Sequence, residues 1–273
     1  MASQISDYLP EFANFLKQIT ADVQAGQISS WKAFATTCRA FYTPDMMNKI
    51  EAIAPGWIDM ASHRDGITLI HVTSVFVALI QSDEYKNATE QQRHLMQWAV
   101  LFHDITKVPV QNGHDYVHGF KSAAVAGKAL TKLDFLTNAT DEEIDAWYDV
   151  TYTATLYSPE HDETVQDIAK LRPIVDGLRH IHGEDAYSIV LAILLHIAIV
   201  TDPEYPILAP MSELDMKYCI TETAFPIIKA MLLADGSGWQ LFAEDKSVEI
   251  KRRAHVTRVL DEFVTLLDFP RNN

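Results

Sequence analysis

Imidazole and carboxylate side chains stand beside apolar runs, in positions where they could do chemistry. In "WAVLFHDITKVP" (98–109), an apolar run ends at His103 and Asp104, and Lys107 follows three residues after the aspartate. A carboxylate in the last turn of a helix faces the negative end of the helix dipole, which is unfavourable by ~0.3–1 kcal/mol. A bound cation would make this position of the carboxylate favourable. The alternative interpretation is an exposed aspartate beside a half-buried histidine.

Two further histidines lie inside very apolar segments. His71 interrupts "ITLIHVTSVFVALIQ" (67–81), and His196 interrupts "IVLAILLHIAIV" (189–200). A buried imidazole without a partner is costly, so each must bond a backbone carbonyl or hold a ligand. His118 opens the alanine-rich segment "HGFKSAAVAGKAL" (118–130).

A second aspartate follows an apolar run in "MLLADGSGW", where Asp235 precedes Gly236. Asp-Gly is also an ordinary turn signal, and Asp202 in "IVTDPEYP" is an alternative to Asp235. Imidazoles and carboxylates from separate helices, meeting inside a bundle, form a metal site with nitrogen and oxygen ligands. No cysteine takes part, which argues against a structural zinc site of the Cys-rich kind.

These side chains must be positioned by helices, because helical patterns dominate the chain. The apolar spacing predicts helices over 67–81, 90–104, 118–133 and 224–235, and Thr140 with Glu143 forms a capping-box signature for another. The segment "VTYTATLY" (150–157) is compatible with a strand or with a continued helix. We therefore predict the all-α class and a single domain over 1–273, with a helical arm over 1–60.

Composition limits the partners. The formal net charge is −15, so the surface repels nucleic-acid polymers and anionic membranes. Only two cysteines occur, which makes a reducing, cytoplasmic setting the default expectation. "MASQISDYLPEF" has no basic or apolar signal-peptide region, so none is expected. The longest apolar run, 189–200, is shorter than the roughly 20 residues of a membrane span.

The ordered set of motifs resembles the HD superfamily of metal-dependent phosphohydrolases. That family has a His on one helix, His-Asp at the end of a second, and an Asp on a later helix, here matched by His71, His103–Asp104 and Asp235. The likeness is closest over 66–130, where "HDITK" is similar to the family's frequent His-Asp-Ile-Gly-Lys, and looser over 187–242. The long interval between His118 and His196 indicates an inserted helical segment at 141–185.

The resemblance implies an HD-like helical bundle with a metal site in its centre, which hydrolyses a small phosphate ester. It implies one metal held by His71, His103, Asp104 and Asp235, and a second held by His118 and His196, with Asp104 as the bridge. The residues expected to act in catalysis are Asp104, Lys107 and His118. One or two divalent ions of Fe, Mn, Co, Ni or Zn suit such ligands. Lys107 is expected either to hold a phosphate oxygen or to be a solvated helix-end lysine, and Lys121 is a weaker candidate of the same kind.

Two other interpretations stay open. Some HD-like folds use a mixed-valence di-iron centre for oxygen-dependent bond cleavage, and four His with two Asp suits that chemistry as well. The second is a degenerate HD-fold module that binds or regulates. A Gly-Tyr-Pro signature is absent, so a cyclic-dinucleotide phosphodiesterase is not indicated. The substrate, a nucleotide or another phosphomonoester, is not specified, and a homo-oligomer is compatible with the sequence.

Overall fold

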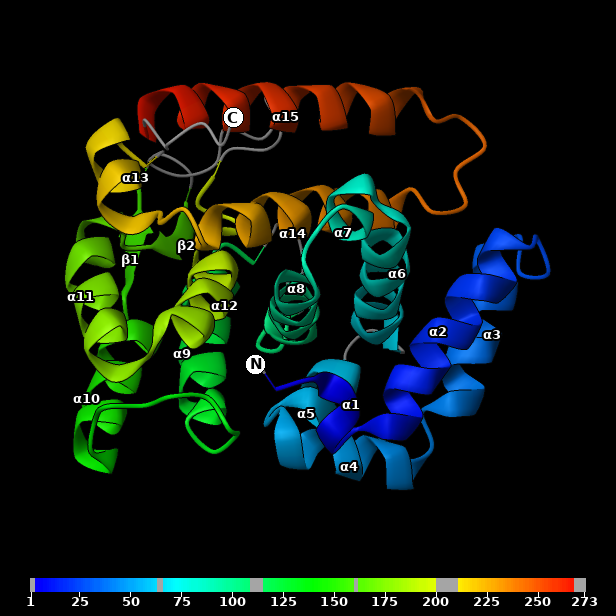
Figure 1. Cartoon of the computed structure of the whole chain (residues 1–273), viewed down its shortest axis with the longest axis horizontal. Helices are drawn as coiled ribbons and strands as arrows, with labels where there is room; N and C mark the ends of the chain where they lie inside the picture. The colour runs from blue at the N-terminus through cyan, green and yellow to red at the C-terminus, as the bar shows by residue number, and fades with distance from the viewer. Residues whose placement is uncertain (1–2, 63–65, 109–114, 160–161, 200–210, 268–273) are drawn as a thin grey trace.

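The chain is mostly α-helical, as predicted, in a computed structural model that describes residues 3–62, 66–108, 115–159, 162–199 and 211–267 (Figure 1). The elements of the first half are α1 (Ile5–Tyr8), α2 (Pro10–Gln24), α3 (Trp31–Phe41), α4 (Pro44–Ile53), α5 (Trp57–Ser62), α6 (Ile67–Gln81), α7 (Asp83–Lys86), α8 (Glu90–Phe102) and α9 (His118–Leu130). Those of the second half are α10 (Asp141–Tyr152), β1 (Thr155–Ser158), β2 (Glu163–Gln166), the 3-10 helix η2 (Ile168–Lys170), α11 (Leu171–Ile181), α12 (Glu184–Leu195), α13 (Glu213–Cys219), α14 (Ala224–Trp239) and α15 (Ser247–Leu267).

Five helices form the centre of the molecule. Helix α14 packs against α6, α8 and α12, and α12 also packs against α8 and α9. The side chains of α6 from Leu69 to Leu79 are all buried, which is the burial expected of a helix that is apolar on every side. These five helices, with the turns that directly follow α8 and α12, carry all the predicted site residues within the described part of the chain.

The helix predicted to end at Asp235 is longer than expected. Helix α14 continues through Gly236 and Gly238 to Trp239, so Asp235 lies inside the helix and not at its end. Gly238 is required by close packing, because a Cβ there would clash with the side chain and backbone of Val75 of α6, whereas one at Gly236 would meet only the flexible end of Arg252 of α15. The packing of α14 against α6 therefore outweighs the tendency of Asp-Gly to form a turn.

The N-terminal helices α1–α5 pack onto α6 and α8 and share their apolar core. Phe12 packs edge-on against Phe76 of α6, with ring centroids 5.6 Å apart. The Tyr42 hydroxyl lies 2.7 Å from Oγ1 of Thr73 in the buried interior. This contact joins the predicted arm to the helix that carries His71.

The segment predicted as a helical insertion, 141–185, contains α10, α11 and a β-hairpin. The prediction of a wholly helical segment is therefore wrong over 155–158 and 163–166, where β1 and β2 pair antiparallel from Thr155–Gln166 to Ser158–Glu163. The segment "VTYTATLY" belongs partly to a helix and partly to a strand, because α10 ends at Tyr152 and β1 begins three residues later. The predicted capping box of Thr140 and Glu143 starts α10.

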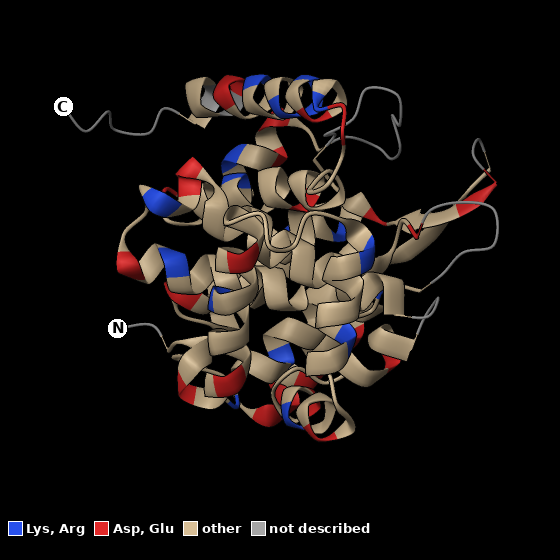
Figure 2. Ribbon diagram, turned by 90° about the vertical axis from the view of Figure 1, so that its right-hand side faces the viewer, with Lys and Arg blue, Asp and Glu red and all other residues tan. Residues whose placement is uncertain are grey.

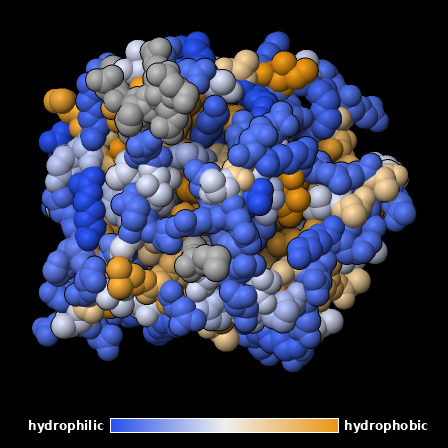
Figure 3. All heavy atoms as spheres, viewed as in Figure 1, coloured by the Kyte–Doolittle hydropathy of each residue, from blue (hydrophilic) through white to orange (hydrophobic). Residues whose placement is uncertain are grey.

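Charged residues lie mainly on the outer helices, and the central helices carry few of them (Figure 2). The face shown in Figure 3 is largely hydrophilic, with small hydrophobic patches. Among the helices that the structure describes, none combines the length and the apolar character needed to cross a membrane.

Candidate metal centre

The histidines and aspartates singled out in the sequence come together in the middle of the five central helices. His71 lies in the second turn of α6, His103 and Asp104 directly follow α8, and His118 opens α9. His196 directly follows α12, and Asp235 lies in α14. The four histidines and Asp104 are at most 4% exposed, and the Asp235 side chain is 21% exposed. Asp202, the alternative final ligand, is outside the described residues.

Three of the four imidazoles are oriented in the same way. Nδ1 of His103 lies 2.8 Å from the carbonyl oxygen of Val100, and Nδ1 of His118 lies 2.6 Å from that of Asp115. Nδ1 of His196 lies 2.5 Å from the carbonyl of Ile193. Each acceptor is three residues earlier in the chain. Because a carbonyl can only accept, Nδ1 carries the proton, and the lone pair of the neutral ring is on Nε2.

The Nε2 atoms of His118 and His196 face each other at 2.9 Å. With both Nδ1 atoms already donating, two neutral rings would direct lone pairs at one another. Such a contact needs a positive charge between or beside the nitrogens, either a proton or a metal ion. The His103 Nε2 is also buried, with no hydrogen-bond partner among the described residues. These observations fit a bound metal, and His with Asp is a suitable donor set.

The ligand atoms form two groups. Those of His71, His103 and Asp235 lie within 4.8 Å of one another, and so do those of Asp104, His118 and His196. Each group offers two nitrogens and one oxygen from three different helices or helix ends.

Asp104 faces both groups. Its Oδ2 is 3.6 Å from Nε2 of His71 and 3.6 Å from Nε2 of His103. Its Oδ1 is 3.1 Å from Nε2 of His118 and 3.8 Å from Nε2 of His196. One carboxylate oxygen therefore points toward each group, which is the arrangement needed for a ligand shared by two ions.

The charge states suit metal binding. Burial lowers the pKa of His71 and His103, against the attraction of nearby Asp235 and Asp104. Burial opposes ionisation of Asp104, but Lys107 and the surrounding histidines outweigh it and hold the pKa of that carboxyl well below its usual range. Asp235 is likewise held ionised, mainly by His71, so that its pKa is lowered. Neutral imidazoles and ionised carboxylates are the forms that coordinate metals.

His118 differs from the other imidazoles. Burial alone would lower its pKa, but hydrogen bonds with Asp104 and Asp115 raise the pKa to about 9. In a metal-free protein this ring is therefore protonated on both nitrogens at neutral pH. The second proton, on Nε2, takes the place that a cation would occupy between His118 and His196.

The two candidate lysines occupy different places. Lys107 Nζ lies 2.8 Å from Oδ2 of Asp104, and its side chain is 30% exposed, so it is not a freely solvated helix-end lysine. Lys121 lies over the ring of Tyr152, with its Nζ 5.5 Å from the ring centre, and contacts none of the six candidate ligands in the interactions described.

Two residues beside the centre were not predicted from the sequence. Asp115 accepts the backbone N–H groups of Val117 and His118 through Oδ1, each at 3.1 Å, and so fixes the start of α9. An aspartate that accepts the backbone N–H groups two and three residues later forms a local Asx turn. Trp239 stacks on His71, and the only signal in the sequence was its spacing of four residues from Asp235.

Comparison with known proteins gives no relative for this chain. No protein-family model matches it, and neither a curated protein nor a solved structure does so at the threshold applied. The fold and the site define an all-α protein with a buried His/Asp cluster, and function must be argued from that cluster.

Proposed function

We propose that the protein is a metal-dependent hydrolase of small phosphate esters. The observation that carries the proposal is Asp104, whose two carboxylate oxygens face two separate groups of metal-ligating atoms. His71, His103 and Asp235 would hold one divalent transition metal, and His118 and His196 another, with Asp104 between them. Bound metals supply positive charge for phosphoryl oxygens and lower the pKa of a water molecule.

The residues of the chain have separate tasks in this proposal. The carbonyls of Val100, Asp115 and Ile193 hold three imidazoles with Nε2 directed inward, so that the ligands need little rearrangement. Lys107 uses one N–H on Asp104, and its remaining donors can bind a phosphate oxygen at the edge of the centre. Burial excludes bulk water from the hydrogen bonds of the four histidines and Asp104.

The resemblance to the HD superfamily supports the same activity, because His71, His103, Asp104 and Asp235 match the family's motif. His118 and His196 fall where many members carry further histidines. The di-iron oxygenase interpretation uses the same residues, and no feature of the described geometry selects it over hydrolysis. The identity of the metal and the consumption of oxygen distinguish the two.

The test is the metal content and phosphatase activity of wild type and four variants. We expect up to two transition-metal ions per wild-type chain, and release of phosphate from p-nitrophenyl phosphate in the presence of manganese. His71→Ala and His196→Ala should each lose one ion, whereas Asp104→Asn should lose both together with the activity. Asp45→Asn, at an exposed position on α4, is the matched control.

Four results would contradict the proposal. Metal and activity could both persist in Asp104→Asn, or wild type could bind metal without hydrolysing phosphate esters. Iron with oxygen consumption and no phosphate release would establish the oxygenase instead. Wild-type protein that takes up no metal from manganese or iron solutions would indicate a binding or regulatory module.

A further inference from the structure

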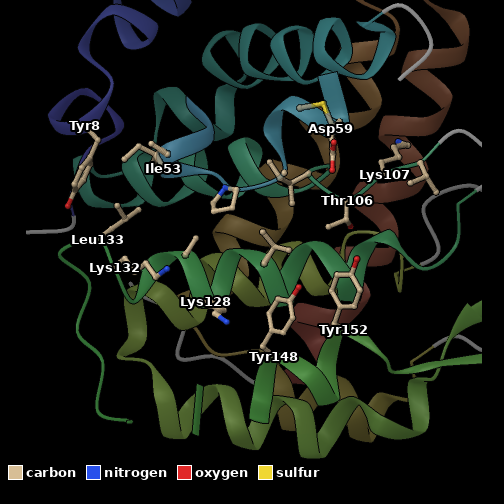
Figure 4. Close-up of a pocket in the computed structure, with 18 residues that line it drawn as sticks. Tyr8, Ile53, Asp59, Thr106, Lys107, Lys128, Lys132, Leu133, Tyr148 and Tyr152 are labelled. Atoms are coloured by element: carbon tan, nitrogen blue, oxygen red, sulfur yellow. The ribbon is translucent and has the colours of Figure 1, made fainter. Parts of the chain in front are cut away.

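A groove of about 770 Å³ lies beside the metal centre, between α4 and α5 on one side and α9 and α10 on the other (Figure 4). Ile105, Thr106, Lys107 and Val108, which follow Asp104 directly, form one end of it. Tyr8, Lys132 and Leu133 form the other end. The six candidate metal ligands do not line the groove, so it is a space additional to the centre itself.

The lining of the groove is more basic than the rest of the chain. Lys107, Lys128 and Lys132 line it, against the single carboxylate of Asp59. The whole chain has 37 acidic and 22 basic residues, so an excess of lysine at one hollow is a local reversal of charge. Such a hollow attracts small anions, although the protein as a whole repels polyanions.

The lysines are separated along the length of the groove. Oγ1 of Thr106 lies 2.9 Å from Oγ of Ser122, which fixes the Lys107 end of the groove against the first turns of α9. Lys128 and Lys132 follow Ser122 by six and ten residues along α9 and its C-terminal turn. At the rise of an α-helix, they lie about 9 and 15 Å further along.

Between these positive ends the walls are apolar or aromatic. Met60, Val125 and Ala129 also line the groove. The rings of Tyr148 and Tyr152, which lie between Lys132 and Lys107 in Figure 4, are stacked with centroids 5.3 Å apart. An apolar chain or a planar ring fits such walls, and an anionic group at each end would be paired with lysine.

We propose that this groove binds the non-reacting part of an elongated substrate, which carries a second anionic group about 10–15 Å from the phosphate held beside Lys107. Lys132, supported by Lys128, pairs with the distal anion. Lys128 is partly engaged, because its Nζ lies 2.6 Å from Asp145, whereas Lys132 is exposed at the far end. This inference rests on the proposed function, which places the reacting phosphate at the metal centre.

The first experiment measures the binding of synthetic phosphonates to the full chain by isothermal titration calorimetry. Octane bisphosphonate has an anionic group at each end, and octylphosphonate has only one. We expect the bisphosphonate to bind about tenfold more tightly, because one further charge-assisted contact forms. Ethane bisphosphonate is too short to reach both ends and should lose this advantage. The advantage should persist with manganese or with a chelator, since the distal lysines are remote from the metal ligands.

Variants at exposed positions locate the distal contact. Lys132→Glu should abolish the preference for the bisphosphonate, whereas Lys17→Glu, the same charge change on exposed α2, should leave it unchanged. Ala52→Trp places a large ring in the groove from an exposed position on α4 and should weaken binding of both octyl compounds. Equal affinity for the two octyl compounds, or equal effects of Lys132→Glu and Lys17→Glu, would overturn the proposal.

A kinetic measurement separates the groove from the proposed function. Octane bisphosphonate should compete with p-nitrophenyl phosphate, and Lys132→Glu should weaken this inhibition, whereas Lys17→Glu should change neither the inhibition nor the hydrolysis of p-nitrophenyl phosphate. Non-competitive inhibition would overturn the assignment of the groove to the substrate. If the protein hydrolyses no phosphate ester but keeps the Lys132-dependent preference for the bisphosphonate, the proposed function fails and the groove remains a dianion site.

Discussion

The indole of Trp239 lies nearly parallel to the imidazole of His71, with ring centroids 4.1 Å apart and 15° between the planes. Trp239 ends α14, one helical turn after Asp235, whose Oδ1 lies 2.9 Å from Nε2 of His71. One face of α14 therefore contacts both the edge and the face of the same imidazole. Because Trp239 is 42% exposed, its indole separates His71 from solvent and restricts rotation of the ring.

Removing the indole should weaken metal binding without unfolding the protein. We expect Trp239→Ala to lower metal affinity by about tenfold, because the residues around a metal ligand fix its orientation. Trp239→Phe keeps a stacking ring and should retain most of the affinity. Equilibrium dialysis against manganese measures both variants, with circular dichroism to verify the helices. Equal affinities for wild type and Trp239→Ala would show that His71 is oriented by α6 and Asp235 alone.

The parts of the centre that could be predicted from the sequence depend on local pattern. The bounds of the helix over 67–81 agree with the prediction, because a mostly apolar segment of this length without glycine or proline is too long for a typical strand. Helix α8 ends at Phe102, two residues before the predicted end at Asp104, where the pattern changes at "HDITKVP". The same local signals predict the all-α class, but they do not identify the hairpin of β1 and β2.

The remaining features depend on contacts between distant segments. Asp235 was predicted at a helix end, but it lies one turn inside α14, because Gly238 allows the helix to pass close to Val75. Trp239 acquires its contact with His71 only through this extension. The contacts of the His103 and His196 imidazoles with the carbonyls of Val100 and Ile193 are local, but the meeting of their Nε2 atoms at one centre depends on the packing of α8 against α12.

Metal removal should lower thermal stability. Ions bound only by the folded chain stabilise it by about 3 kcal/mol at a hundredfold excess over the Kd. For a chain of this size we expect chelation to lower the Tm by roughly 5–10 °C, with the exact shift set by the affinity. Differential scanning calorimetry with and without EDTA provides the measurement. Asp104→Asn should show no response to EDTA, and an equal response in that variant would place the stabilising ions elsewhere.

The buried imidazole of His182, remote from the centre, should make folding sensitive to acid. Burial lowers its pKa from 6.5 to about 4, with a small opposing effect of the Gly127 backbone. Between these values the unfolded chain binds the extra proton, so stability falls as the pH decreases through this window. The loss should approach 3 kcal/mol between pH 7 and pH 4, on the order of 1.4 kcal/mol per unit of pKa difference.

Urea unfolding of wild type and His182→Gln across this range provides the measurement. The variant removes only this imidazole, so the difference in unfolding free energy between the two proteins should narrow as the pH falls. A difference that stays constant from pH 7 to pH 4 would mean that His182 is not kept neutral by the fold. The contributions of other titrating groups to the unfolding free energy cancel in the comparison, because both proteins contain these groups.

Trp147 lies between two glycines and fixes the distance between α9, α10 and α11. A Cβ at Gly127 of α9 or Gly177 of α11 would overlap its indole, and its Nε1 donates to the carbonyl of Ile174 at 2.9 Å. Gly127→Ala should therefore lower the unfolding free energy by about 1–3 kcal/mol, although alanine is the better helix former. If the clash is the cause, the same substitution should cost less in a Trp147→Phe background, where the ring is smaller. Urea unfolding of the two single variants and the double variant measures this coupling, and equal costs in both backgrounds would exclude the clash as the cause.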